Sequence, residues 1–398
     1  MSWPRDDAKL DRVRSLLAEQ ELDALVVRAP DNVLYLTNFW GMKGFDAAVF
    51  PREGEPVLVT IEPSAQDAAE MAWTEDVRYV PGYDAADPRP PALRSLETAR
   101  ETAKPYGRVG VELSLGTQAT DRMVGEPTTY TKAWFDAFPD AVDGTPLLNA
   151  ARAIKTGQEL ERMRLANEIA AAAMEHVAHE LEPGMKESEA AALWQGFVHG
   201  EGTGWKGKVE LALGFSLVWS GPGIRTFTAT GHRPVQEHEP TLFEIWVCAD
   251  GYWCDHTKNV CPGTLDGRYD ELLDALLAVY ERALDHCRPG ASLAELDRLI
   301  RSGISDAGLD EPTHPIAHGV GARAHEPPYA HQAAGGTIER GMVLAIEPGA
   351  YWEGGGGLRV EDNFLITADG VEKLSSYPDD FRGLTPKGSD PSLRRRCS

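Results

Sequence analysis

An apolar run at residues 243–259, FEIWVCADGYWCDHTKN, carries two carboxylates at positions where strand side chains are expected. Burial of an unpaired carboxylate is costly enough that such a group normally loses its charge or acquires a partner. The residues at 249–251, Ala-Asp-Gly, predict a hairpin turn, so Glu244 and Asp255 occupy neighbouring antiparallel strands. We therefore expect a cation between the two side chains, with further ligands from other parts of the chain.

Two registers of this hairpin keep both carboxylates on one face. With the turn at 250–251, Glu244 faces Thr257 and Asp255 lies diagonal to Glu244. With the turn at 249–250, Glu244 and Asp255 are direct partners. A register shifted by one residue would place the two carboxylates on opposite faces, so only the first two arrangements produce a site.

Further candidate ligands follow in the last third of the chain. Residues 341–367 predict a second apolar hairpin, with Glu347 at the end of one strand and Glu361 within the next. His318 and His325 belong to a glycine-rich loop, where the backbone can approach a ligand closely. Carboxylates on strands together with one or two histidines suit divalent ions such as Mn²⁺, Co²⁺ or Zn²⁺.

The chain of 398 residues exceeds the usual size of a single core, so we expect two domains, 1–153 and 154–398. The first alternates helical stretches with strand-like runs, at 24–27, 56–60, 77–80 and 108–113. This alternation predicts an α/β domain. One long helical pattern over 149–181 then leads into the second domain.

A weak repeat in the second domain predicts internal symmetry. LEPGMKESEAA at 181–191 and CRPGASLAELD at 287–297 share a Pro-Gly stop after a long helix and a new helix start, with Glu189 and Glu295 in register. Because the surrounding helix, turn and helix also recur, we expect a pseudo-symmetric domain with a site between its halves.

Composition excludes several classes of protein. A net charge of −23 repels a phosphate backbone, and apart from the terminal RRR the sequence has no basic stripe, so nucleic acid is not an expected partner. The charged N-terminus and the lack of a bilayer-length apolar run predict a cytoplasmic protein without a membrane contact. Five cysteines without CxxC spacing argue against a thiolate zinc site.

As an ordered set, these motifs resemble the pita-bread superfamily of creatinase, prolidase, aminopeptidase P and methionine aminopeptidase, and its two-domain Xaa-Pro dipeptidases in particular. The motifs that carry this resemblance are DNVLYLTNF, IKTGQELERMRLA, SGPG, CDHTKN, AHGVGARAHEPP, AIEPGAY and LRVEDN. The resemblance implies an α+β fold: a creatinase-like α/β N-terminal domain, followed by a pita-bread domain with pseudo-twofold helix pairs over a curved antiparallel sheet.

The resemblance also implies a dinuclear metal site, with Mn²⁺ expected and Co²⁺ or Zn²⁺ as alternatives. Its ligands would be Glu244, Asp255, His318, Glu347 and Glu361. Thr257 and Arg359 stand where the superfamily braces the site. Glu244 departs from the superfamily pattern, which has aspartate there, and the longer side chain moves the carboxylate by roughly one C–C bond, about 1.5 Å.

By the same resemblance, the reaction is hydrolysis of an Xaa-Pro bond in dipeptides or short peptides by a metal-bridging hydroxide. Glu347 would act as general base, and His232 and His325 would donate hydrogen bonds to the oxyanion. Arg359 or nearby groups would bind a substrate carboxylate. A homodimer is expected on the same grounds.

Two other functions remain open at this point. One is a creatinase-like or ectoine-hydrolase-like C–N hydrolase, or an osmolyte lyase, on the same fold; Glu244 in place of aspartate favours this possibility. The other is a catalytically inactive binding module. Each residue also has a structural alternative: Glu244 could face solvent, Arg359 and Glu361 could form a surface ion pair, and His232 and His325 could be structural.

Overall fold

The computed structural model describes residues 3–41, 44–113, 128–226, 228–352 and 355–384. The chain divides into two compact units, Met1–Arg152 and Ala153–Ser398, and each is described by itself. The basic run at 394–396 lies outside the described residues. Within the described ranges, no helix combines the length and the apolar character needed to cross a membrane.

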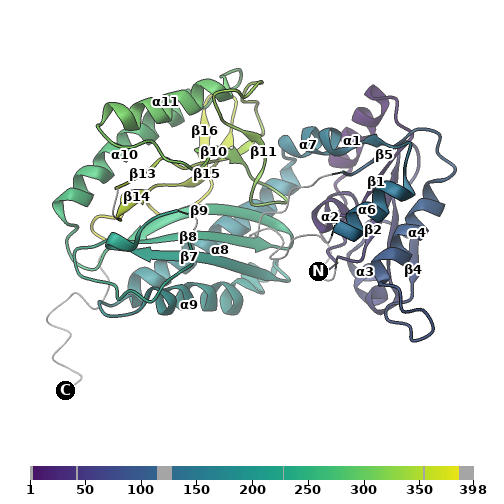
Figure 1. Ribbon diagram of the computed structural model, residues 1–398, viewed down its shortest axis with the longest axis horizontal. Coiled ribbons are helices and arrows are strands. Elements are labelled where there is room, and N and C mark those ends of the chain that lie inside the picture. Colours follow the sequence, from purple (N-terminus) through teal and green to yellow (C-terminus); the bar gives the residue numbers. More distant parts are fainter. Residues whose placement is uncertain (1–2, 42–43, 114–127, 227, 353–354, 385–398) are drawn as a thin grey trace. The chain divides into compact units, whose positions relative to one another are not determined.

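The N-terminal unit is built on a six-stranded mixed sheet in the order β4-β3-β2-β1-β5-β6 (Figure 1). Its strands are β1 Ala24–Val27, β2 Ala47–Pro51, β3 Val57–Ile61, β4 Val77–Val80, β5 Val109–Val111 and β6 Val142–Asp143. Its helices are α1 Asp7–Glu19, α2 Pro30–Thr37, α3 Ala65–Met71, α4 Pro91–Ala103, α6 Thr128–Ala137 and α7 Thr145–Ala153. The four predicted strands are β1, β3, β4 and β5, whereas the sequence analysis missed β2 and β6.

Helices cover both faces of this sheet, which explains why its central strands are buried throughout. Leu25 and Val27 pack with α1, α2 and α7, while the alternate residues Ala24 and Val26 pack with α4 and α6. Successive strand side chains point to opposite faces, so one short strand contributes to two cores.

The helical pattern over 149–181 forms two helices, so the prediction of one long helix is wrong. α7 ends at Ala153 and α8 spans Gly157–Glu180. Thr156 caps α8: its Oγ1 accepts the Glu159 N–H at 3.3 Å, and the Glu159 carboxylate accepts the Thr156 N–H at 3.0 Å. This capping box requires extended backbone at Thr156, and a helix cannot continue through it.

The C-terminal unit contains two main sheets, each covered by a pair of helices (Figure 1). The first sheet consists of β7 Ala212–Ser220, β8 Thr241–Ala249 and β9 Tyr252–Val260, and it lies against α8 and α9 Glu187–Phe197. The second has the order β11-β10-β12-β15-β16, formed by β10 Ala317–Gly319, β11 Glu326–Tyr329, β12 Val343–Ile346, β15 Asp362–Ile366 and β16 Val371–Lys373. The short hairpin β13 Gly349–Tyr351 and β14 Gly357–Arg359 lies beside it, against α10 Gly267–His286, which packs on α11 Leu293–Asp306.

The turn after α8 and the turn after α10 repeat each other, as the predicted internal symmetry requires. Gly184 follows α8 with a φ of +94°, and Gly290 follows α10 with a φ of +90°. The Gly184 N–H donates to the Val235 carbonyl at 2.8 Å, and the Gly290 N–H donates to the Ile338 carbonyl at 2.9 Å. Both glycines lie in the turn that follows the helix end, where a positive φ favours glycine.

The β8–β9 hairpin adopts the first of the two expected registers. Glu244 pairs with Thr257, and Asp255 pairs with Trp246. Asp250 and Gly251 both have positive φ, 46° and 87°, as a two-residue hairpin turn of this kind requires. The alternative register with Glu244 opposite Asp255 is therefore wrong, and the diagonal arrangement places both carboxylates on one face.

The second predicted hairpin is more elaborate than expected. β12 pairs with β15, while β13 and β14 form a separate hairpin between them. Glu347 directly follows β12, as predicted, but Glu361 lies between β14 and β15 and forms an isolated bridge with Thr257. The inserted hairpin thus carries the chain back so that Glu361 reaches β9.

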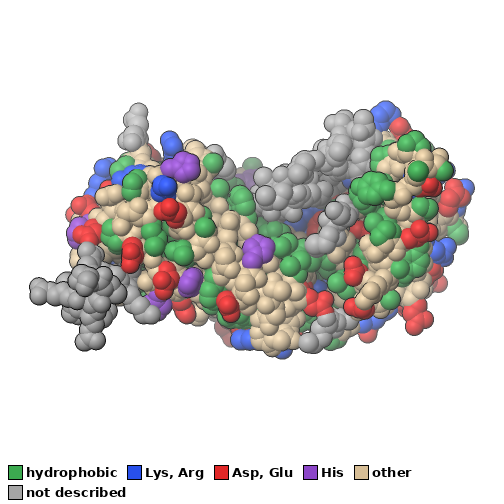
Figure 2. Space-filling view, turned by 90° about the horizontal axis from the view of Figure 1, so that it is seen from below, with side chains coloured by type: hydrophobic (Ala, Val, Ile, Leu, Met, Phe, Trp, Pro, Cys, Tyr) green, Lys and Arg blue, Asp and Glu red, His purple; other side chains and the backbone are tan. Residues whose placement is uncertain are grey.

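Acidic residues outnumber basic residues in this chain. On the face shown in Figure 2, acidic side chains lie scattered among lysine and arginine side chains. The whole sequence has 62 acidic and 39 basic residues. This distribution repels a polyanion.

Candidate metal centre

Five predicted ligands converge in the C-terminal unit, although they come from distant parts of the sequence. β8 and β9 contribute two carboxylates, the strand β10 contributes a histidine, and the segments after β12 and after β14 contribute one carboxylate each. These residues are Glu244, Asp255, His318, Glu347 and Glu361. All except Glu244 are buried, and the Glu244 side chain is only 14% exposed.

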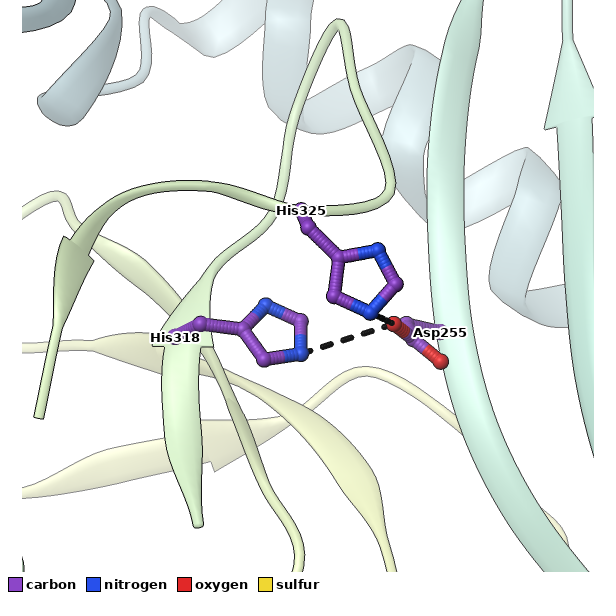
Figure 3. Close-up of side chains that lie close together, drawn as sticks. All are labelled: Asp255, His318 and His325. Atoms are coloured by element: carbon purple, nitrogen blue, oxygen red, sulfur yellow. Dashed lines mark ion pairs between the residues drawn. The ribbon is translucent and has the colours of Figure 1, made fainter. Parts of the chain in front are cut away.

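The two predicted histidines of the glycine-rich loop both point at the same carboxylate (Figure 3). His325 Nε2 lies 3.2 Å from Asp255 Oδ2, and His318 Nε2 lies 3.5 Å from the same oxygen. His318 Nε2 also lies 3.6 Å from Glu347 Oε1. The imidazole of His318 therefore stands between Asp255 on β9 and Glu347, which follows β12.

The ligand atoms form three overlapping groups, each with its atoms within 4.8 Å of one another. Among the described residues these groups are Asp255, His318 and His325; His318, Glu347 and Glu361; and Glu244, Asp255 and Glu361. Shared members link the groups into one site. Oxygen-rich groups with imidazole fit divalent ions such as Mn²⁺, Co²⁺ or Zn²⁺.

The chemistry of His318 supports this assignment. Its Nδ1 donates to the Gly319 carbonyl at 3.0 Å, which leaves the lone pair on Nε2 directed at the carboxylates. Burial lowers the pKa of His318 to about 4, so the ring is neutral near pH 7. A neutral imidazole with one nitrogen held by a carbonyl is the form that ligates metals.

The Glu347 carboxylate, in contrast, favours its protonated form when no cation is bound. Burial raises the pKa of Glu347 well above its ordinary range, and the nearby Glu361 raises it further. A low-dielectric site disfavours two like charges close together. A divalent cation would relieve this repulsion and favour the ionised form of Glu347.

Thr257 and Arg359 connect the carboxylates by hydrogen bonds. Thr257 Oγ1 donates to Glu361 Oε2 at 2.6 Å, and Arg359 Nε donates to Thr257 Oγ1 at 2.6 Å. Arg359 also forms an ion pair with Glu244. Glu244 and the Arg359–Glu361 pair are thus part of the buried site and are not a surface arrangement.

Two residues without a predicted role extend the site. His314 Nδ1 lies 3.3 Å from Glu347 Oε2, and Tyr351 Oη lies 3.2 Å from His314 Nε2. Arg359 Nη1 donates to Tyr351 Oη at 3.4 Å. These contacts connect Glu347 to Arg359, and the only hint in the sequence is that His314 stands four residues before His318.

His232 is placed differently from the other predicted residues. It is exposed, in the segment between β7 and β8, and belongs to none of the three ligand groups of the described chain. The structure therefore brings His325, but not His232, to the carboxylates.

Buried carboxylates and a neutral histidine on a fold of two similar halves define a metal-dependent hydrolase. The chain belongs to metallopeptidase family M24, whose model matches residues 161–368, and the creatinase/prolidase N-terminal domain matches residues 9–154. The expected superfamily, fold and enzyme class are thereby confirmed: the protein is a metallopeptidase with a pita-bread catalytic domain.

Full-length relatives support the same placement. The Xaa-Pro dipeptidase of Lactobacillus delbrueckii subsp. lactis is 26% identical over 393 residues, which cover 95% of this chain and 99% of the relative. The Xaa-Pro dipeptidase of Pyrococcus furiosus is 25% identical over 379 residues, 92% of this chain and 97% of that protein. The solved prolidase from Pyrococcus horikoshii OT3 has a TM-score of 0.77 at 21% identity, with coverage of 94% and 99%.

Proposed function

We propose that this protein hydrolyses Xaa-Pro bonds in dipeptides or short peptides, using two divalent ions held within residues 154–398. The observation that carries the proposal is the neutral His318, whose Nε2 faces Asp255 and Glu347 in a buried carboxylate cluster. The similarity to two Xaa-Pro dipeptidases over more than nine tenths of the chain supports the substrate class.

Bound divalent ions would lower the pKa of a bound water to near neutrality and would polarise the scissile carbonyl. Glu347 accepts the proton of the attacking water and passes it to the leaving nitrogen. His325, beside Asp255, donates a hydrogen bond to the oxyanion. His232 remains our candidate for a second donor, on a segment that would have to approach the site.

Arg359 is the candidate cation for a substrate carboxylate. Its buried guanidinium contacts Glu244 and Thr257, so it lies beside the reacting groups. A buried guanidinium interacts strongly with a second carboxylate because little water screens it. Recognition of a free carboxylate would favour dipeptides over longer peptides.

The decisive experiment compares metal content with activity. Protein stripped with a chelator and reloaded with Mn²⁺, Co²⁺ or Zn²⁺ is assayed on Leu-Pro, Leu-Leu and a longer Leu-Pro peptide. We expect hydrolysis of Leu-Pro only after reloading, and we expect His318→Ala to lose both metal and activity. His331→Ala, which alters an exposed histidine outside the three ligand groups, is the matched control and should keep both.

The C–N hydrolase remains the second candidate because Arg359 is already paired with Glu244, which then has less charge to offer a metal. Metal-free protein that hydrolyses creatine and ignores Leu-Pro would refute the peptidase proposal. Glu244→Asp separates the two further: a gain of bound Mn²⁺ with faster Leu-Pro hydrolysis supports the peptidase.

We also propose Mn²⁺ as the native metal, a homodimer and a cytoplasmic location. The oxygen-rich ligand set supports Mn²⁺. Resemblance to the superfamily supports the dimer. Light scattering on the purified protein would refute the dimer by returning a mass near 43.4 kDa, that of one chain.

A further inference from the structure

The strands that carry the ligands are not joined by a regular backbone ladder. β9 belongs to the three-stranded sheet and β15 to the five-stranded sheet, although the two lie side by side (Figure 1). At their junction the described backbone forms a single isolated bridge, between Thr257 and Glu361. Something other than a ladder has to fix the distance between Asp255 and Glu361.

Asparagine side chains take the place of the ladder on both sides of the bridge. Asn363 Nδ2 donates to the Asp255 carbonyl at 2.7 Å, and the Asp255 N–H donates to Asn363 Oδ1 at 3.0 Å. On the other side of the bridge, Asn259 of β9 makes the second contact: its Nδ2 donates to the Arg359 carbonyl at 2.9 Å. An amide side chain reaches further than a backbone group. These bonds therefore connect the strands at a separation wider than that of a regular ladder.

A buried ion pair closes the opposite face of the same junction. Alternate strand residues point to opposite faces, so Lys258 and Asp362 lie behind the ligands. Lys258 Nζ lies 2.6 Å from Asp362 Oδ2, and both side chains are almost fully buried. Lys373 Nζ lies 3.2 Å from Asp362 Oδ2, and Asp379 Oδ1 lies 2.9 Å from Lys258 Nζ. The four side chains form a balanced group of two cations and two anions.

We propose that Asn259, Asn363 and the Lys258–Asp362 pair are positioning residues that set the separation of Asp255 and Glu361, and thereby the affinity of the site for divalent cations. The proposal rests on the proposed metal-dependent function. Metal–ligand distances hold to within about 0.2 Å, so a small shift of β15 against β9 is enough to weaken binding. None of these residues belongs to the three ligand groups of the described chain, so they would act through the ligands.

The test is a calorimetric titration of chelator-treated protein with Mn²⁺. Loss of a group that orients metal ligands typically weakens binding about 10–100-fold, and we expect a rise of that size in the Mn²⁺ dissociation constant for Asn363→Ala and for Lys258→Met. Asn32→Ala is the matched control. It removes a buried amide of the N-terminal unit that accepts a 2.7 Å hydrogen bond from Arg152.

Thermal unfolding of the same metal-free variants separates positioning from stability. A merely structural role would lower the melting temperature of Asn363→Ala and Asn32→Ala alike and leave Mn²⁺ affinity unchanged in both. An unchanged dissociation constant in folded Asn363→Ala overturns the inference but leaves the proposed function intact. Wild-type protein that takes up no Mn²⁺ refutes both. If Asn363→Ala does not fold, Asn259→Ala, which removes a single bond, decides by the same criterion.

Discussion

The buried ion pair between Lys155 and Glu326, the residue after His325, allows us to predict the size of a stability change. Lys155 Nζ lies 2.9 Å from Glu326 Oε1, and the two side chains are 1% and 3% exposed. At that distance the attraction is about 6 kcal/mol for an effective dielectric constant of about 20. Removing one partner from a buried pair leaves a charge without compensation and costs about 3–5 kcal/mol.

We therefore expect Lys155→Met to lower the free energy of unfolding by about 3–5 kcal/mol. The double variant Lys155→Met/Glu326→Leu should recover most of this loss because no buried charge remains. The Glu326 carboxylate fills the space where a side chain on Gly321 would lie, since a Cβ there would be only 2.4 Å from Glu326 Oε1. Because Glu326 adjoins His325, Lys155→Met should also slow peptide hydrolysis.

Urea unfolding of metal-free protein, followed by tryptophan fluorescence, measures these changes without a contribution from metal binding. The wild type, the two single variants and the double variant form a complete cycle. A loss below about 1 kcal/mol in Lys155→Met, the range of exposed pairs, would refute the reasoning because it would mean that water reaches Glu326. A double variant no more stable than the single variant would refute it as well.

Two further predictions concern the same unit. Burial lowers the pKa of His256 to about 4, below that of an unfolded histidine, so the unfolded chain binds the proton first as the pH falls. Between pH 7 and 4.5, metal-free wild type should lose about 2–3 kcal/mol of stability that His256→Gln does not lose, and equal slopes in urea unfolding would contradict this. A Cβ at Gly319 would lie 2.6 Å from the Pro327 carbonyl oxygen, so Gly319→Ala should cost about 1–3 kcal/mol and lower the melting temperature. Gly335→Ala, where nothing lies within 4 Å, is the calorimetric control, and an equal shift in both would count against the clash.

Features set by neighbouring residues could be predicted from the sequence. The Ala249-Asp250-Gly251 segment predicted the β8–β9 hairpin and left two registers open, and the structure adopts the one with its turn at Asp250-Gly251. The capping box of Thr156 and Glu159 is likewise a local sequence pattern, and it marks the start of α8. The Pro-Gly repeat indicated the internal symmetry for the same local reason.

Long-range pairing could not be predicted in this way. Nothing near His314 in the sequence indicates its contact with Glu347, and Lys155 is separated from Glu326 by 171 residues. The inserted hairpin β13–β14 also altered the position expected for Glu361. Each depends on how complete helices and sheets pack, which no short window of sequence specifies.

The sequence by itself thus determined the superfamily, the candidate metal ligands and the hairpin that places Glu244 and Asp255 on one face. Only the tertiary structure decided which charges share a buried space: Arg359 with Glu244, His325 with Asp255, and His232 outside the cluster. Turns and caps are specified by bonds between near neighbours. The burial and pairing of charges depend instead on how distant strands and loops pack against each other.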